Sequence, residues 1–201
     1  MMKIQDVHFL KSCAAVSQFP RYHHPEIAFF GRSNVGKSSL INMLMKKRDL
    51  VKTGSTPGVT KMVNFFLLND AISIADLPGF GFAKVPHAIR SGFLPLIRKY
   101  IDARQNLRLA FLLIDVRRVP DDMELEILSL LTGRSVPVAV TLTKCDKLSR
   151  SQRSRSVSAI AEALGVPQDA LFISSAKSGD GRRELLGLIE EHTAGAAGAG
   201  D

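Results

Sequence analysis

The chain has 201 residues, of which 45% are hydrophobic, and its formal net charge at pH 7 is +8. This length allows one domain with one sizeable core, and apolar runs such as 109–116 are far shorter than the roughly 20 residues of a membrane span, so we expect a soluble, cytoplasmic monomer with no membrane partner. The excess of Lys and Arg fits a polyanionic partner such as nucleic acid, although a solvated basic surface would look the same.

Short apolar runs alternate with amphipathic stretches, a pattern typical of a mostly parallel sheet covered by helices. The residue pair Asn69-Asp70 is turn-prone and too short for a crossover helix, so the strands that flank it should form an antiparallel hairpin. The expected strands are 27–30, 62–68, 71–75, 108–115, 136–142 and 170–174, and the expected helices are 37–46, 88–103, 122–132, 151–164 and 182–192.

These elements predict an α/β fold of three layers, in which a six-stranded, mostly parallel sheet with one antiparallel strand has helices on both faces. We expect residues 1–193 to form this single domain, with an N-terminal extension over 1–25. The last eight residues, 194–201, read "AGAAGAGD" and cannot bury apolar surface, so we expect a disordered tail there.

Residues 31–38 match the phosphate-binding loop Gly-x-x-x-x-Gly-Lys-Ser, and they lie between an expected strand and an expected helix, as this motif requires. The glycines let backbone amides curl towards phosphates, and the helix N-terminus adds partial positive charge. Lys37 would reach the terminal phosphates, while the Ser38 hydroxyl would bind Mg²⁺. The residues predicted to line the phosphates are Gly31, Arg32, Ser33, Asn34, Val35, Gly36, Lys37, Ser38 and Ser39.

Two later segments complete the predicted phosphate and metal site. Thr60, next to Gly58 and just before the second expected strand, is favoured over Thr53 and Thr56 to close over Mg²⁺ and the terminal phosphate. The third expected strand ends in "ADLPG", where Asp76 would hold the magnesium through a water molecule and Gly79 would offer its amide to the terminal phosphate.

The nucleotide base is predicted by the segment "TLTKCD", residues 141–146. A carboxylate only accepts hydrogen bonds, and guanine presents two adjacent donors that adenine lacks, so Asp146 selects guanine and argues against an ATP-dependent phosphotransferase. Lys144 would lay its aliphatic stem along the base. The remaining residues predicted to contact the base are Thr143, Ser174, Ser175 and Ala176, and the run Ser175-Ala176-Lys177 can present a backbone amide to guanine O6.

With these residues in place, the chain resembles the EngB/YihA family of ribosome-biogenesis GTPases, within the translation-factor class of P-loop GTPases. The stretches that carry the resemblance are "PEIAFFGRSNVGKSSLIN", "TPGVTKMVNFF", "DLPGFGFAKV" and "TKCDK", and it extends from about Phe9 to His192. Two positions depart from the family pattern: Val59 replaces a usual arginine, and Phe80 a usual tyrosine.

The resemblance implies a protein that binds GTP and GDP with Mg²⁺ and hydrolyses GTP slowly as a molecular switch. It further implies a role in assembly of the large ribosomal subunit, linked to cell division, with ribosomal RNA and proteins of the precursor as partners. By position, Ser38, Thr60 and Asp76 would hold the metal. The alternative is a signalling-type GTPase with a protein or membrane partner, which the basic charge also permits.

The reaction needs a water molecule in line with the terminal phosphate, which many small GTPases hold with a glutamine after Asp-x-x-Gly. Phe80 occupies that position and can neither donate nor accept a hydrogen bond. The predicted catalytic residues are therefore Lys37, Thr60 and Asn34, with Asn34 helping to coordinate a K⁺ ion beside the phosphates. Alternatively, Asn34 merely caps the loop.

Overall fold

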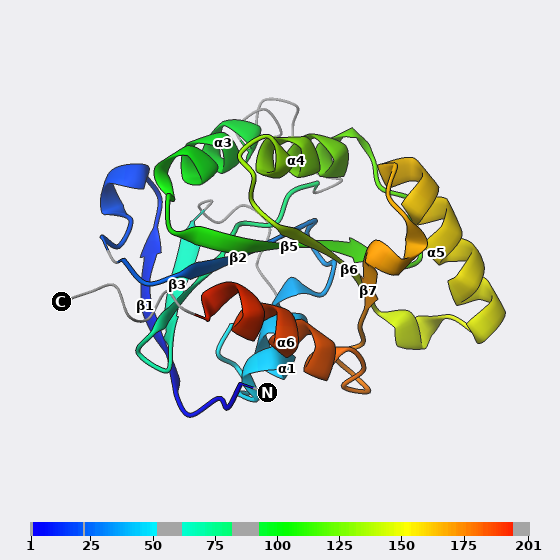
Figure 1. The fold of residues 1–201 in the computed structure, drawn as a ribbon, viewed down its shortest axis with the longest axis horizontal. Coiled ribbons are helices and arrows are strands. Elements are labelled where there is room, and N and C mark those ends of the chain that lie inside the picture. The colour runs from blue at the N-terminus through cyan, green and yellow to red at the C-terminus, as the bar shows by residue number, and fades with distance from the viewer. Residues whose placement is uncertain (1, 22, 52–61, 82–92, 195–201) are drawn as a thin grey trace.

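A computed structural model describes residues 2–21, 23–51, 62–81 and 93–194 of the chain (Figure 1). Several predicted features lie outside these residues: Gly58 and Thr60 with the competing Thr53 and Thr56, the first part of the expected helix 88–103, and positions 195–201 of the expected tail. The predicted site can therefore be assessed in its phosphate loop, its Asp76 to Gly79 segment and its base-binding loops.

The described residues form one seven-stranded sheet in the order β1-β3-β4-β2-β5-β6-β7. Among these strands only β3 runs against the others, because it pairs antiparallel with both β1 and β4 while the remaining pairs are parallel. The strands are β1 (Val7–Cys13), β2 (Glu26–Gly31), β3 (Val63–Leu68), β4 (Ile72–Asp76), β5 (Leu107–Asp115), β6 (Val138–Thr143) and β7 (Leu171–Ile173).

The predicted hairpin between β3 and β4 is confirmed. Asn69 and Asp70 both adopt φ = +52°, which suits a two-residue hairpin turn, and Ala71 N–H donates to Leu68 O at 3.1 Å. The mostly parallel sheet with one antiparallel strand is confirmed as well.

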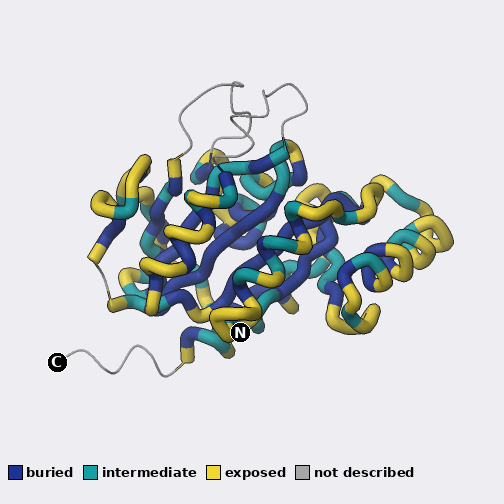
Figure 2. The backbone as a smooth tube through the Cα atoms, turned by 90° about the horizontal axis from the view of Figure 1, so that it is seen from above, coloured by how far each residue is buried: buried dark blue, intermediate teal, exposed yellow. Residues whose placement is uncertain are grey.

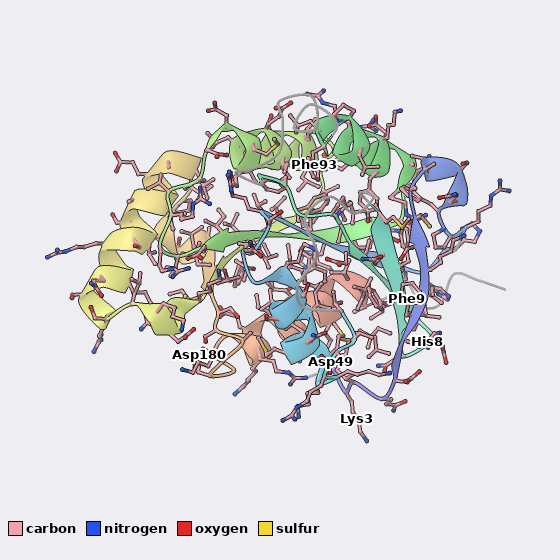
Figure 3. The ribbon with its side chains drawn as sticks, turned by 180° about the vertical axis from the view of Figure 1, so that it is seen from behind. Lys3, His8, Phe9, Asp49, Phe93 and Asp180 are labelled. Carbon is pink, nitrogen blue, oxygen red and sulfur yellow. The ribbon has the colours of Figure 1, made fainter. Side chains whose placement is uncertain are left out.

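The expected count of six strands was wrong, because β1 adds a seventh strand at the edge of the sheet beside β3. Its register shifts between Phe9 and Lys11, so a bulge at Leu10 interrupts the two-residue alternation that marks a strand. Phe9 is also 53% exposed despite packing edge-on against Phe66 at 5.5 Å. Figure 3 shows Phe9 and its neighbour His8 at this outer edge.

Helices cover both faces of the sheet, as expected (Figure 1). Buried side chains of α1 and α6 pack with Phe29 and Phe111 on one face, where these two rings stack at 4.9 Å. On the other face, α3 and α4 pack over Phe30 and Leu112, and α5 packs farther along over β6 and β7. The helices are α1 (Lys37–Met45), α3 (Phe93–Ala103), α4 (Asp122–Thr132), α5 (Arg150–Leu164) and α6 (Arg182–Thr193), with 3-10 turns η1 (Val16–Gln18), η2 (Cys145–Lys147) and η3 (Gln168–Ala170).

Burial follows this layered arrangement. Figure 2 shows a dark buried band along the strands, with exposed backbone concentrated on the outer sides of the helices and in the turns. Among the described residues, no helix combines the length and the apolar character that crossing a membrane requires.

A buried polar network ties the N-terminal extension to the start of β2. Glu26 accepts hydrogen bonds from Tyr100 Oη at 2.6 Å and from Arg104 Nε at 2.8 Å, and Arg104 Nη1 donates to Pro20 O at 2.7 Å. Because each buried charge here has a partner, the network leaves no charge uncompensated at this end of the sheet. The opposite ends of the strands carry the predicted site.

Candidate functional site

The predicted motifs meet at the carboxyl ends of neighbouring strands. The phosphate loop follows β2, Asp76 ends β4, Thr143 ends β6, and the loop with Ser175 follows β7. These strands run in the same direction within one sheet, and open α/β sheets bind ligands at this edge. The structure therefore brings the described parts of the predicted site together.

The phosphate loop curls through two left-handed residues before α1 begins. Asn34 has φ = +63° and Gly36 has φ = +105°, and α1 begins at Lys37 with Leu40 N–H donating to Gly36 O at 2.9 Å. The N-terminus of α1 thus faces the loop, an arrangement that favours an anion at this position.

Lys37 and Asp76, predicted from different motifs, form a direct ion pair through Nζ and Oδ1. Asn64 Nδ2 also lies 3.4 Å from Asp76 Oδ2. The Ser33 hydroxyl is buried and has no hydrogen-bond partner within the described part of the chain. The loop therefore offers the unpaired Ser33 hydroxyl, together with the Asp76 carboxylate and the Lys37 ammonium group. These are the donors and acceptors that a phosphate with a divalent cation requires.

A cavity of about 190 Å³ opens beside this loop. It lies between the start of α1 and the two loops that follow β6 and β7, which is where the base was predicted to bind. The predicted residues that line it are Gly36, Ser39, Thr143, Lys144, Asp146, Ser174 and Ala176.

The Asp146 carboxylate is held in place from the β7 loop. Ser175, which is fully buried, donates from Oγ to Asp146 Oδ1 at 2.7 Å, and this hydrogen bond lowers the pKa of Asp146. Cys145 N–H also donates to Ser174 O at 3.2 Å, so the two loops are joined. Asp146 is consequently an ionised acceptor with one fixed oxygen, as recognition of paired donors on a base requires.

Two residues of the site were missed by the sequence reasoning, Asp115 and Arg117. Lys144 Nζ lies 2.9 Å from Asp115 Oδ2 and donates to Asn34 O at 2.5 Å. Arg117 donates two hydrogen bonds to the Asp115 carboxylate, from Nε at 2.9 Å and from Nη2 at 2.7 Å. Burial alone would raise the pKa of Asp115, but the hydrogen bonds from Arg117 and Lys144 outweigh burial and hold this pKa well below its usual range. Asp115 therefore stays charged and orients Lys144. The available signal was its position at the end of β5, between two strands that carry predicted site residues.

The structure also shows where the side chains of Phe80 and Arg32 lie. Phe80 is fully buried and packs in the core with residues of α3. Arg32 was predicted to line the phosphates, but its guanidinium pairs with Asp121 and approaches Glu124 at the start of α4. Burial raises the pKa of Glu124 to about 7. The Arg32 side chain therefore contacts the start of α4 rather than the predicted phosphate site.

Comparison with known proteins agrees with this geometry. Residues 26–144 match the family model described as 50S ribosome-binding GTPase. The chain is 47% identical over 184 residues to the "Probable GTP-binding protein EngB" of Desulforapulum autotrophicum, covering 92% of this chain and 95% of that protein. It is 43% identical over 189 residues to the protein of the same name from Geobacter sp. strain M21, covering 94% of this chain and 88% of the relative.

Solved structures show the same fold. A crystal structure of a probable GTP-binding protein engB superposes with a TM-score of 0.70 at 30% identity, covering 84% of this chain and 98% of that one. The GDP·AlF4⁻ complex of Aquifex aeolicus Era superposes with a TM-score of 0.62 at 22% identity, over 84% of this chain and 56% of Era, and this likeness concerns the fold alone.

Proposed function

This chain belongs to the EngB family of GTP-binding proteins, and we propose that it is a Mg²⁺-dependent GTPase that works as a molecular switch in assembly of the large ribosomal subunit. Family membership supports guanine-nucleotide binding and GTPase activity. The observation that carries the choice of guanine is the Asp146 carboxylate, held by the buried Ser175 hydroxyl at 2.7 Å on the rim of a base-sized cavity.

In this proposal the metal is held by Ser38 and, through a water molecule, by Asp76, with Thr60 as a further ligand from the segment outside the described residues. Their oxygen atoms are the donor type that Mg²⁺ prefers, and the bound ion neutralises charge on the terminal phosphates. Lys37, now paired with Asp76, provides the ammonium group for those phosphates. When a nucleotide binds, Lys37 exchanges its carboxylate partner for a phosphate, so the positive charge of Lys37 stays compensated.

Hydrolysis in this proposal depends on Asn34, since Phe80 is buried and has no group to hold a water molecule. Within the described residues the Asn34 carbonyl accepts from Lys144, while its side chain is exposed and makes no hydrogen bond that would cap the loop. That free amide favours coordination of K⁺ over the capping alternative. Turnover should be faster in KCl than in NaCl for the wild type, and Asn34→Ala should abolish the difference; equal rates in both salts for the wild type would contradict this role.

The ribosomal role is supported by the description of the matching family, 50S ribosome-binding GTPase, and by the net charge of +8, which favours ribosomal RNA and its proteins as partners. We propose a cytoplasmic monomer with no membrane partner. Depleting the protein and sedimenting ribosomes tests this assignment. Immature large subunits should accumulate, whereas an unchanged profile would favour the signalling-type alternative.

A further inference from the structure

The segment that follows Asp76 is joined to the phosphate loop by its backbone. Ser33 N–H donates to Phe80 O at 2.7 Å, and Phe80 N–H lies 3.4 Å from Gly31 O, so the pairing of β2 with β4 continues beyond both strands. At Gly79, an added Cβ would lie 3.0 Å from Ser33 Oγ and 3.1 Å from Ser33 Cα. Gly79 is therefore packed directly against the loop that binds phosphates.

Arg32 extends this contact to Gly81, two residues after Gly79. Its Nη2 atom lies 3.4 Å from Gly81 O. Gly81 has φ = +73°, and an added Cβ would come within 2.6 Å of the guanidinium carbon. An added side chain at Gly81 would therefore displace the guanidinium.

The same guanidinium contacts the first turn of α4. Arg32 Nη1 is hydrogen-bonded to Asp121 Oδ2, and Glu124 Oε2 lies 3.7 Å from Nη1. These carboxylates form the cap of α4, because Asp121 accepts from Met123 N–H at 3.2 Å and Glu124 accepts from Asp121 N–H at 3.2 Å. The Glu124 side chain is only 3% exposed and that of Arg32 only 18%, so the cluster is partly shielded from solvent.

We propose that Arg32 is a positioning residue that couples the Gly79–Gly81 segment to the first turn of α4, so that binding of the terminal phosphate changes the conformation or mobility of that helix end. The coupling rests on the proposed GTPase function, since Gly79 is the residue predicted to offer its amide to that phosphate. Any shift of Gly79 moves Phe80 and Gly81, and Arg32 carries the shift to Asp121. By thermodynamic reciprocity, a change at Asp121 alters affinity for the nucleotide that carries the terminal phosphate.

Two substitutions at opposite ends of the coupling test it. Arg32→Ala keeps the backbone of the phosphate loop and removes the guanidinium, whereas Asp121→Asn weakens the ion pair but retains a residue that caps helices well. The matched control is Arg98→Ala, which removes an exposed ion pair between α3 and α4, with Arg98 Nη2 2.7 Å from Glu126 Oε1. Calorimetric titration measures the affinities of each protein for GDP and for a non-hydrolysable GTP analogue.

When the contact of Arg32 with Gly81 and Asp121 is lost, binding of the terminal phosphate must itself order the Gly79–Gly81 segment. Each variant should therefore lose affinity for the GTP analogue about 5- to 20-fold relative to GDP, a usual size for coupling between sites. The double variant should lose no more than the larger single loss, because both substitutions remove one interaction. Arg98→Ala should match the wild type.

A GTP-to-GDP affinity ratio that stays within twofold of wild type in both variants would overturn the proposal, and so would additive losses in the double variant. Failure of the wild type to bind either nucleotide would instead overturn the proposed function. Hydrogen exchange of the nucleotide-free protein separates the two cases: Arg32→Ala should speed exchange at the Phe80 and Met123 amides, which donate to Gly31 O and Asp121 Oδ1, and unchanged rates would refute the coupling itself.

Discussion

Replacing Asp115 with Asn should weaken GDP binding about tenfold. Asp115 is the acceptor that holds Lys144 at 2.9 Å, and Asn offers one neutral oxygen and places an amide nitrogen towards one of the two cations. A hydrogen bond to a charged group contributes about 1.5–3 kcal/mol. Since Lys144 is 28% exposed and Arg117 47%, solvent screening reduces this to about 1.4 kcal/mol, or one power of ten in affinity.

Displacement of a fluorescent GDP analogue measures this change at fixed salt. The matched control is Asp102→Asn, the same substitution in an exposed ion pair between Asp102 and Arg134, which lies beside the starts of β5 and β6, whereas the site lies at their carboxyl ends. Asp102→Asn should leave the Kd for GDP unchanged, because exposed pairs contribute little. A Kd for Asp115→Asn within twofold of wild type would show that Lys144 binds the nucleotide without support from Asp115, and would contradict the role given to Asp115.

Asp146→Asn should move base preference from guanine towards xanthine, as competition between GDP and XDP would show; retained guanine preference would contradict the base assignment. Burial raises the pKa of Glu124 to about 7 from 4.5, so the folded protein keeps a proton that the unfolded chain loses, and stability should fall by about 3 kcal/mol between pH 4.5 and 7. Chemical denaturation of Glu124→Gln should lack that fall; a parallel pH profile would contradict it. Gly81→Ala forces a side chain against Arg32 at φ = +73° and should lower the free energy of unfolding by about 1–3 kcal/mol, whereas Gly187→Ala, where an added Cβ meets nothing within 4 Å, should not destabilise the protein.

The fold was predictable where local chemistry determines it. Asn69-Asp70 is a turn pair that tolerates positive φ, and it marked the hairpin between β3 and β4 correctly. Strand β1 was missed because the bulge at Leu10 breaks its alternation and the exposed Phe9 contradicts the usual rule that large apolar residues are buried. A strand of this kind is defined by its partner β3, some fifty residues later in the chain, which no local pattern reveals.

The site likewise contains residues that local sequence motifs predicted and residues that they did not. Motifs of consecutive residues, such as the phosphate loop and the segment ending at Asp146, were predicted from spacing, and the structure brings their described residues together. Asp115 and the direction of the Arg32 side chain were not predicted, because the role of Asp115 depends on its contact with Lys144, which follows a later strand, and Arg32 pairs with Asp121, 89 positions away. Long-range pairing of charges leaves no periodic signal.

In the proposed function, nucleotide state controls association of this protein with the large ribosomal subunit. Purified protein loaded with a non-hydrolysable GTP analogue or with GDP can be sedimented with 50S particles at a fixed salt concentration, since charge-driven RNA binding depends on salt. The protein should sediment with the particles when it carries the GTP analogue and remain in the supernatant when it carries GDP. Equal sedimentation with both nucleotides, or none with either, would contradict the account.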